Sequence, residues 1–588
     1  MSKPQDDVFL QFDFNTNSGA AEAPLIFTRP LEIISTYSFE EVASCLEQIE
    51  QKVADGYYTA GYFSYEMTYA LNNMELNQNQ QPKMPLLWFG VFDQPVTPSS
   101  SETKEEAFVV GDWKPQVTQT AYERAFSTIM KAIQRKETAQ INYTIPFEAT
   151  FSGDAFSFYN HLKKAQQSNY CAYLNLDEPY TILSASPELF FHVKEEMITV
   201  RPMKGTAKRG KSSQEDQRQK RTLQQSPKNK LENQLIINVM KQELEKVASA
   251  SSIQVIDKYR LEQYPTVFQL TTGIQGKLKD NMRISDIIRA LFPCGSIAGD
   301  PKHTSISIIQ ETEKQLREVY CGAVGYITPR QEAIFNVPIR TVWLNQQSHK
   351  AHYGAGGAIT ENSNVKEEYK EALTKTDILH LAYPDFALLE TIRLENGEIF
   401  LLEKHLERLL ASATYFSIPV DTATIHETLN QAERTYPKGV WRIRLTLNDK
   451  GKTDTSVRPL TDSNLHKVRL AQQAINKENV FHYHKTTHRL MYQEHQIDNF
   501  DYLDTLLWNE QNEVTEFTIG NIVVEINDML YTPPISSGLL PGTFRQQLLE
   551  RNVIQEKHIL KENLPDCERI WLINSVRKWV EVSLKTSE

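Results

Sequence analysis

At 588 residues the chain is too long for one hydrophobic core, so we expect two to four domains. A net charge of −11 argues against a nucleic-acid partner, because phosphate binding needs a basic surface. The five scattered cysteines form no Cys-x-x-Cys pair, and neither a signal-peptide pattern nor an apolar run of the roughly 20 residues that cross a bilayer is present. These features predict a cytoplasmic protein without membrane partners.

Short apolar runs bounded by turn residues dominate the first 200 residues and predict strands. Helical stretches separate them, most clearly at 39–55 and 121–136. Strands in runs with long helices between them favour an α+β fold over a repeating βαβ array. The predicted strands are APLIFTRP, TAGYFSYEM, LLWFGVF, YCAYLNL, YTILSAS and LFFHVK.

A charged, glutamine-rich stretch at 208–220 follows and predicts an exposed loop, because acids and amides interrupt its basic residues. A helical pattern resumes at 226–246. The residues expected on the apolar face of this helix are Leu231, Leu235, Val239 and Leu244.

A domain boundary is predicted near Tyr383, where a helical pattern gives way to the strand pattern FALLETIRL. The pair Asn396–Gly397 then predicts a hairpin turn, as expected for a new domain that opens with two strands. The predicted domains are therefore 1–380 and 381–588, and the second is long enough to have a fold of its own.

Four loops of the first domain are dense in glycine and polar residues, as catalytic loops often are. They are SASPELF (184–190), RPMKGT (201–206), PCGSIAGDPK (293–302) and HYGAGGAITENS (352–363). With QINYT, LEQYPTVFQL, REVYCGAVGY and FNVPIRT, they resemble the chorismate-utilising enzymes in consistent order. This family includes anthranilate, aminodeoxychorismate, isochorismate and salicylate synthases. The resemblance covers about 24–375 and implies the family's β-sandwich with surrounding helices.

Within this family, anthranilate synthases typically have alanine before the Gly-Thr of RPMKGT, whereas aminodeoxychorismate synthases have lysine, here Lys204. The resemblance implies that the Lys204 amine adds to C2 of chorismate as the C4 hydroxyl leaves, and that ammonia then enters at C4. We therefore expect the pocket to lower the pKa of Lys204. Glu188 is the expected general acid, and Gln140 replaces the water-activating lysine of isochorismate-type members.

The resemblance also implies Mg²⁺, which neutralises the ring carboxylate of the dianionic substrate. Its expected ligands are Glu232, Glu368 and Glu371, of which the last two share a helix face. The positions that match substrate-binding residues are Gly205, Thr206, Tyr320, Arg340, Gly354, Ala355 and Gly356.

The helix of Glu232 departs from the family pattern. Asn238 stands where the family has aspartate, and Lys241 where it has arginine. Asn229 occupies a position where an acid is common, and Phe268 a position where histidine is common. These departures leave open a first domain that binds chorismate or regulates without full catalysis.

The second domain contains HYHKTTH (482–488), whose histidines lack the HExxH arrangement of a zinc site. Lys485 inside this segment is more informative about function than the histidines are. With LLETIRLENGEIFLLEKHLERLLASATYF, NEVTEFTIGNIVV, TPPISSGLLPGTFR and INSVRKWV, the segment resembles the fold-type IV pyridoxal-phosphate enzymes, which include transaminases and aminodeoxychorismate lyase. The resemblance covers nearly all of 384–588 and implies an α+β fold of two subdomains.

In that family, Lys485 matches the lysine that holds pyridoxal phosphate, Glu516 the partner of the pyridine nitrogen, and Arg408 the phosphate ligand. The remaining residues that match cofactor positions are Gly542, Thr543, Asn574 and Ser575. The amides of the first two would add phosphate donors at a helix start.

Together the resemblances imply synthesis of 4-aminobenzoate, a folate precursor, by amination of chorismate and then loss of pyruvate. Fold alone does not separate a lyase from a transaminase, but fusion to a synthase whose product is the lyase substrate favours the lyase. The alternative is an anthranilate-type synthase fused to an amino-acid transaminase. No glutamine amidotransferase part is recognisable, so we expect ammonia from a separate glutaminase subunit. A homodimer through the second domain stays open.

Overall fold

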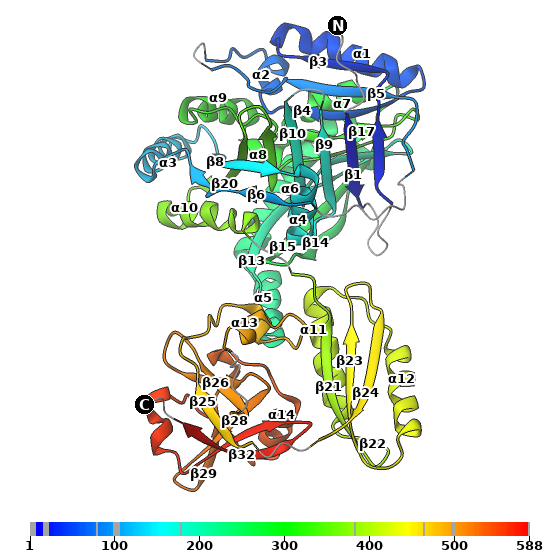
Figure 1. The fold of residues 1–588 in the computed structure, drawn as a ribbon. Coiled ribbons are helices and arrows are strands. Elements are labelled where there is room, and N and C mark those ends of the chain that lie inside the picture. The colour runs from blue at the N-terminus through cyan, green and yellow to red at the C-terminus, as the bar shows by residue number, and fades with distance from the viewer. Residues whose placement is uncertain are drawn as a thin grey trace. The chain divides into compact units, whose positions relative to one another are not determined.

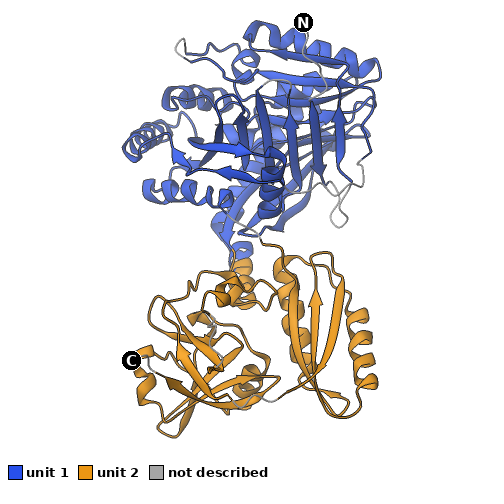
Figure 2. Ribbon diagram, in the orientation of Figure 1, with its two compact units in different colours: residues 1–208, 222–383 blue, residues 209–221, 384–588 orange. Residues whose placement is uncertain are grey.

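The computed structural model describes residues 8–15, 23–77, 80–97, 106–176, 179–380, 384–461, 465–495 and 501–585. The chain forms two compact units, which Figure 2 colours separately. The first comprises 1–208 and 222–383, and the second comprises 209–221 and 384–588. Tyr383, near which the sequence predicts a boundary, lies outside the described residues. No helix within the described ranges is long and apolar enough to cross a bilayer.

Two antiparallel sheets form the centre of the first unit (Figure 1). The first sheet runs in the order β16 (Gly299–Asp300), β8 (Gln140–Gly153), β20 (Lys350–Thr360), β19 (Thr341–Asn345), β10 (Tyr180–Ser186), β9 (Tyr170–Asn175), β1 (Phe9–Phe14), β2 (Leu25–Thr28), with β6 (Phe108–Val110) and β7 (Lys114–Pro115) paired to β8. The second runs in the order β13 (Met203–Lys208), β15 (Val267–Lys277), β12 (Met197–Arg201), β11 (Leu189–Lys194), β18 (Ala333–Asn336), β17 (Ala323–Ile327), β4 (Tyr58–Phe63), β5 (Leu87–Phe92), β3 (Glu32–Thr36), with β14 (Gln254–Gln263) paired to β15.

The apolar faces of these two sheets meet. One buried cluster takes Phe12 and Ile182 from the first sheet and Tyr62 and Trp88 from the second. Such alternation of inward apolar residues holds two sheets face to face. The first unit is therefore a β-sandwich, as the sequence predicts.

Helices cover the outer faces of the sandwich, each held by a further apolar cluster. The first sheet carries α3 (Gln119–Gln134), α4 (Ala155–Gln166), α9 (Lys302–Thr312) and α10 (Val365–Thr374). The second carries α1 (Val42–Ala54), α6 (Pro227–Val247) and α7 (Ile284–Leu291). The short helices are α2 (Met67–Leu71) and α8 (Gly295–Ala298). The helices predicted at 39–55, 121–136 and 226–246 are thus confirmed.

The apolar face predicted for the last of these helices is wrong at Leu231 and Leu235, which are 64% and 59% exposed. Leu244 is buried as predicted, together with Ile236 and Met240. These three also have helical spacing, so the sequence offers two apolar stripes. The structure turns inward the stripe that also carries Asn233, a buried polar residue with partners in the sandwich.

The exposed loop predicted at 208–220 is also wrong. Most of it lies in the helix α5 (Ser213–Gln225), and residues 209–221 belong to the second unit. Arg209 is buried there with Asp216, to which its Nε and Nη2 atoms donate at 2.6 and 2.8 Å. A buried charge needs such a partner, and the pairing of these two residues is not visible from charge composition.

The second unit contains two further sheets. The smaller runs in the order β22 (Glu398–Ile399), β21 (Leu388–Glu395), β23 (Val440–Leu447), β24 (Thr453–Pro459), and α11 (Leu402–Phe416) and α12 (Thr422–Thr435) accompany it. The larger runs in the order β27 (Val514–Phe517), β26 (Asp504–Trp508), β25 (Lys467–Leu470), β32 (Lys578–Lys585), β31 (Arg569–Asn574), β28 (Gly520–Ile526), β29 (Met529–Thr532), β30 (Gln555–Glu556). The short helices α13 (Leu490–Gln493) and α14 (Thr543–Glu550) complete the unit. The hairpin predicted at Asn396–Gly397 is confirmed, with φ of 51° and 81° between β21 and β22.

Candidate active sites

Lys204 lies on the edge strand β13, where this strand is irregular. Its register against β15 shifts between Met203 and Thr206, and Gly205 between them has a φ of 91°. That left-handed conformation suits glycine, because other residues meet steric resistance there. The Gly-Thr after the lysine therefore bends the strand at the position of the amine.

Asn233 of α6 fixes the backbone of Lys204. Its Nδ2 donates to the Lys204 carbonyl at 2.7 Å, and its Oδ1 accepts from Thr272 Oγ1 at 3.0 Å. The amide is fully buried with both ends satisfied, which makes this contact specific. Sequence reasoning missed Asn233, although a polar residue inside an apolar helix stripe is a visible signal.

The amine of Lys204 is influenced by three nearby carboxylates and by one other lysine. Burial lowers the pKa of its amine, and nearby Lys375 lowers it further, whereas Glu188, Glu232 and Glu371 act in the opposite direction. Desolvation has the largest effect, and its direction is the one expected from the sequence.

Glu188 follows β10 and is only 2% exposed. Its Oε1 accepts from Ser296 Oγ of α8 at 2.6 Å. Burial raises the pKa of Glu188 to about 7, opposed by the Ser296 hydrogen bond and by Lys204. The carboxyl can therefore carry a proton near neutral pH, as a general acid requires.

Glu368 and Glu371 share one face of α10, beside Gly357, where a Cβ would lie 3.4 and 3.7 Å from their oxygens. Burial raises the pKa of Glu368, and Glu371 raises it further, although Ser363 donates to it at 2.7 Å. The negative charges of these two carboxylates repel each other, and a bound cation would relieve that repulsion. Carboxylate oxygens are ligands that suit Mg²⁺.

The three predicted metal ligands do not form a closed cluster. Glu232 is partly exposed, 4.0 Å from Lys228, and Glu371 Oε1 lies 2.7 Å from Lys375 Nζ. Among the described residues, the group of three acids with ligand atoms within 4.8 Å of one another is Glu525, Asp528 and Glu568 in the second unit. The carboxylates are the oxygen donors that Mg²⁺ prefers, but the structure does not bring all three predicted ligands within reach of one ion.

Arg340, one of the predicted substrate residues, contacts Lys375, the ion-pair partner of Glu371. Arg340 Nη1 and Tyr353 Oη both donate to the Lys375 carbonyl, at 3.3 and 2.8 Å. A Cβ on Gly354 would lie 2.5 Å from the ring of Tyr320, so this position requires glycine. Lys375, which sequence reasoning missed, connects the two groups and lies one turn after Glu371.

Three further predicted substrate positions, Gly356, Ala355 and Thr206, differ in their burial and in their contacts. Gly356 accepts from Lys375 Nζ at 2.7 Å, and a Cβ there would lie 2.0 Å from the Tyr143 carbonyl oxygen. Ala355 is buried beside it in the core of the first sheet. Thr206 is exposed, and its side chain makes no hydrogen bond within the described ranges, so the structure does not bring it into the cluster.

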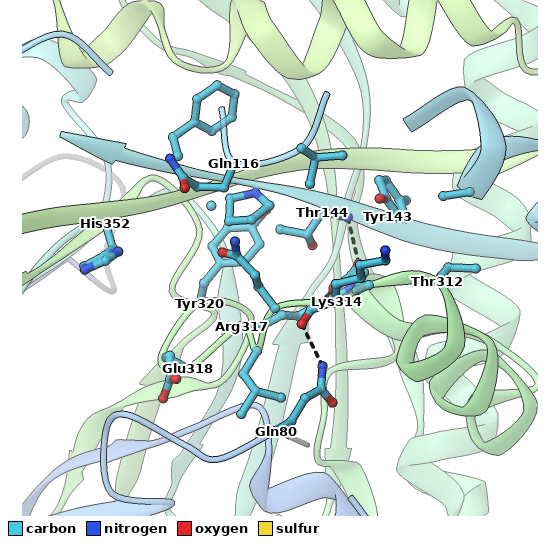
Figure 3. A pocket seen from close by; sticks show the side chains of 18 of the residues that line it. Gln80, Gln116, Tyr143, Thr144, Thr312, Lys314, Arg317, Glu318, Tyr320 and His352 are labelled. Carbon is cyan, nitrogen blue, oxygen red and sulfur yellow. Dashed lines mark hydrogen bonds and ion pairs between the residues drawn. The ribbon is translucent and has the colours of Figure 1, made fainter. Parts of the chain in front are cut away.

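A cavity of about 660 Å³ borders this region in the first unit (Figure 3). Tyr320 and Gly354 line it, whereas Lys204 and Glu188 do not. Arg317 forms a charged part of its wall and donates to both oxygens of Glu313 at 2.7 and 2.9 Å. The cavity therefore reaches Tyr320 and Gly354 but neither Lys204 nor Glu188, and the Arg317 cation in its wall is already paired with Glu313.

Two of the departures from the family pattern have structural explanations. Asn238 is exposed on α6, where it accepts a hydrogen bond from Gln234 Nε2 at 3.2 Å. Phe268 is fully buried and packs with Leu223 and Leu270. Neither residue contributes to the lowered pKa of Lys204, which comes from burial and from nearby charged side chains.

A second cavity, of about 340 Å³, lies in the second unit. All seven residues predicted to bind its cofactor line this cavity: Arg408, Lys485, Glu516, Gly542, Thr543, Asn574 and Ser575. Burial lowers the pKa of Lys485 to about 8, and Arg408 lowers it further. A partly neutral amine at the base of a cavity suits a lysine that bonds to an aldehyde.

Glu516 lies in the same cavity, 3% exposed. Its Oε1 accepts from Tyr492 Oη at 2.8 Å and its Oε2 from Asn521 Nδ2 at 3.2 Å. Burial raises the pKa of Glu516 to about 8. A carboxyl so desolvated favours a cationic partner, such as a protonated pyridine nitrogen.

Arg408 of α11 is positioned by Glu390 of β21, which sequence reasoning missed. Its Nε and Nη2 donate to the two carboxylate oxygens at 2.9 and 2.6 Å, and His405 Nδ1 lies 2.6 Å from Glu390 Oε2. These partners hold the pKa of the buried Glu390 at about 2. The guanidinium is therefore fixed before any phosphate arrives.

The expected helix start is confirmed, because α14 begins at Thr543 with Gly542 as its N-cap. A Cβ on Gly542 would lie 1.9 Å from Asn521 Oδ1, so the close approach requires glycine. The first amides of a helix bind phosphate well. With an amine, a carboxyl and an arginine, the cavity fits pyridoxal phosphate.

The three histidines around Lys485 do not form a metal site. His484 is buried with its Nδ1 3.0 Å from Ser412 Oγ, and His488 lies beside the Phe481 ring. His482 is buried against Tyr492. Burial lowers the pKa of His482 to about 4 and of His484 to about 3, so both are neutral side chains of the core.

Comparison with known proteins agrees with this architecture. Residues 14–380 match the model of the chorismate binding enzyme family, and the chain belongs to this family. Residues 387–584 match the class IV amino-transferase model, so an enzyme domain of a second family is fused to the first.

Aminodeoxychorismate synthase component 1 of Escherichia coli is 33% identical over 274 residues, which are 47% of this chain and 60% of that protein. Anthranilate synthase component 1 of Saccharolobus solfataricus is 31% identical over 275 residues, 47% and 65% of the two chains. The chain thus spans about three fifths of the length of these relatives. Anthranilate synthase component I from Streptococcus pneumoniae has the same fold, with a TM-score of 0.52 at 20% identity over 63% of this chain and 90% of that one.

Proposed function

We propose that this chain makes 4-aminobenzoate from chorismate and ammonia, as an aminodeoxychorismate synthase followed by an aminodeoxychorismate lyase. The observation that carries the proposal is Lys204, a desolvated amine that faces Glu188, at the position where anthranilate-type members typically have alanine. The identity to aminodeoxychorismate synthases supports the same choice.

The first step follows from these two side chains. The neutral Lys204 amine forms a bond to C2 of chorismate, the two conjugated ring double bonds shift, and the C4–O bond breaks. Glu188, with a pKa of about 7, gives its proton to the departing hydroxyl, which leaves as water. Ammonia then forms a bond at C4 as both ring double bonds return and the C2–N bond breaks, which releases Lys204 as a neutral amine. Glu188 takes the extra proton from the new C4 amine and is ready for the next cycle.

Glu232, Glu368 and Glu371 would hold Mg²⁺, which when bound neutralises the ring carboxylate of the substrate. Arg340 and Tyr320 would hold the enolpyruvyl carboxylate, beside the backbone of Gly354. Arg340 is well suited to this role because a guanidinium matches a carboxylate with two parallel hydrogen bonds.

In the second unit, pyridoxal phosphate supplies an electron sink when bound. Arg408 and the amides at the start of α14 would hold its phosphate, and Glu516 its ring nitrogen. Lys485, with a pKa of about 8, would take the proton from C4 of aminodeoxychorismate. The bond between ring C3 and the enolpyruvyl oxygen then breaks, and the released enolpyruvyl group takes up the proton to become pyruvate. The ring that remains is aromatic 4-aminobenzoate.

Ammonia would come from a separate glutamine amidotransferase, because the relatives are named as component 1 of a synthase. Free ammonium should replace this partner in vitro. A purified chain that is fully active with ammonium but gains nothing from any glutaminase subunit of the same cell would argue against such a partner.

The test is to supply the purified chain with chorismate, ammonium, Mg²⁺ and pyridoxal phosphate, and to measure the products by chromatography. We expect 4-aminobenzoate and pyruvate in equal amounts. Anthranilate as the main product would favour the alternative synthase, and no turnover of chorismate would favour a first domain that only binds. Supplying aminodeoxychorismate directly tests the second unit by itself.

A further inference from the structure

The cavity around Lys485 carries more positive charge than its cofactor requires. Its cationic lining residues are Arg408, Arg442, Arg444, Lys485, Arg489 and Arg577, and its acid is Glu516. A bound phosphate monoester contributes up to about two negative charges. Once Glu390, the partner of Arg408, is counted, the five arginines still exceed the phosphate and the two acids together by about one charge.

The excess arises from arginines that have no acid partner. Arg408 is occupied by Glu390, and Arg489 donates to the Thr518 carbonyl at 2.5 Å. By contrast, Arg442, Arg444 and Arg577 form no ion pair with any acid in the described ranges. Their guanidinium groups remain available to a ligand.

Arg442 and Arg444 point to one side of β23. They alternate with buried Ile443 and Leu445, and both are exposed. Side chains two residues apart share a face of a strand, so both belong to the face that borders the cavity together with Thr391 of β21. The strand therefore presents two guanidinium groups side by side to the cavity that Lys485 also lines.

The neighbours on this face make the arrangement costly. Arg442 lies opposite Arg393 of β21 and opposite Arg458 of β24. Like charges directly opposite one another destabilise a sheet, and Glu395 offsets only Arg393, at 2.9 Å. An anionic ligand at Arg442 removes this repulsion, which gives the row of arginines a function in binding.

We propose that Arg442 and Arg444, assisted by Arg577, form a subsite for the carboxylates of a dianionic, ring-shaped substrate. This inference rests on the proposed function, since aminodeoxychorismate carries two carboxylates, and it deepens it by naming specificity-determining residues. The subsite disfavours a neutral amino acid with one carboxylate, the substrate class of an ordinary transaminase. Each guanidinium can hold a carboxylate by two parallel hydrogen bonds.

The experiment compares the full-length variants Arg442→Met and Arg444→Met with Arg434→Met, which removes an exposed arginine of α12 outside the cavity. With aminodeoxychorismate as substrate, we expect each of the first two to raise KM at least about tenfold with kcat changed less than about threefold. Arg444→Lys should recover part of the loss. The control variant and the visible absorbance of bound pyridoxal phosphate should be unchanged.

Two ring-shaped probes separate this inference from the proposed function. Isophthalate has two carboxylates and benzoate has one, and both are followed by the change they cause in cofactor absorbance. We expect the unmodified chain to bind isophthalate at least about tenfold more tightly, and the two variants to lose that preference. If the preference is present but aminodeoxychorismate is not converted, the proposed function fails and the subsite stands. If aminodeoxychorismate is converted with an unchanged KM in both variants, the subsite is wrong.

Discussion

The two lysines that we propose as catalytic are both buried, but the charged groups around them differ. Burial lowers the pKa of both Lys204 and Lys485. Lys204, however, faces the acids of the first unit, whereas the cavity of Lys485 is lined by arginines. The comparison teaches that desolvation favours the neutral amine in both sites, so the differing charges nearby are free to serve other groups. Under the proposed function these groups are a cation and a leaving hydroxyl in one site, and a phosphate and carboxylates in the other.

The largest effect should come from removing either lysine. Lys204→Ala should lower aminodeoxychorismate formation by at least about a thousandfold and leave the conversion of added aminodeoxychorismate intact. Lys485→Ala should do the reverse, so that aminodeoxychorismate accumulates from chorismate. The exposed Lys208 on the same strand as Lys204 provides a control, Lys208→Ala, with normal activity. Loss of both activities in either variant would contradict independent roles.

The next effect concerns the acid beside Lys204. Glu188→Gln should lower the synthase rate by about 10²- to 10⁴-fold, because a general acid contributes that much. Since the protonated form is active and the pKa is about 7, activity of the unmodified chain should fall as pH rises through about 7. A rate measured against pH checks this, and an unchanged profile in the variant would assign the proton to another group.

In the site around Lys485, removal of the buried acid Glu390 should lower the stability of the second unit, although the site has an excess of positive charge. Glu390→Gln leaves Arg408 without its buried partner and should destabilise the second unit by about 3–5 kcal/mol. Because the folded pKa of about 2 lies below the usual 4.5, the stability from Glu390 is complete above pH 4.5 and is lost as pH falls toward 2. Thermal unfolding at several pH values measures both effects, and Glu398→Gln, an exposed change on the same sheet, is the control.

The smallest effect is expected where the sequence differs from its family but the structure places no catalytic contact. Asn238→Asp, which introduces the family residue, should change the synthase rate by no more than about twofold, because surface changes are usually that small. Asn233→Asp on the inward stripe of the same helix should lower the rate much more, since it removes the donor to Lys204. A large gain from Asn238→Asp would show that the outer metal shell limits the enzyme.

The sequence predicted what depends on local pattern and on family motifs. The turn at Asn396–Gly397 and the helix at 39–55 need only local rules, and both are found. Asn233 and Glu390 were missed because their roles depend on partners 39 and 18 residues away in the chain, Thr272 and Arg408. No periodicity reveals such pairs.

The orientation of α6 shows the same limit. Helical spacing allowed two apolar stripes, and the choice between them depends on which one meets the second sheet. The roles of the individual site residues stay predictions, although the structure gathers all seven cofactor residues around one cavity.

The segment 209–221 has a practical consequence for anyone who divides this chain. The polypeptide leaves the first unit after Lys208, contributes a short stretch to the second, and returns at 222. A fragment that starts at residue 384 would expose the Tyr415 carbonyl, which Arg209 Nη2 covers at 2.8 Å, and His484, whose Nε2 lies 3.2 Å from the Lys211 carbonyl. No single cut releases both units whole, so the two units are interleaved in the chain and not merely joined end to end.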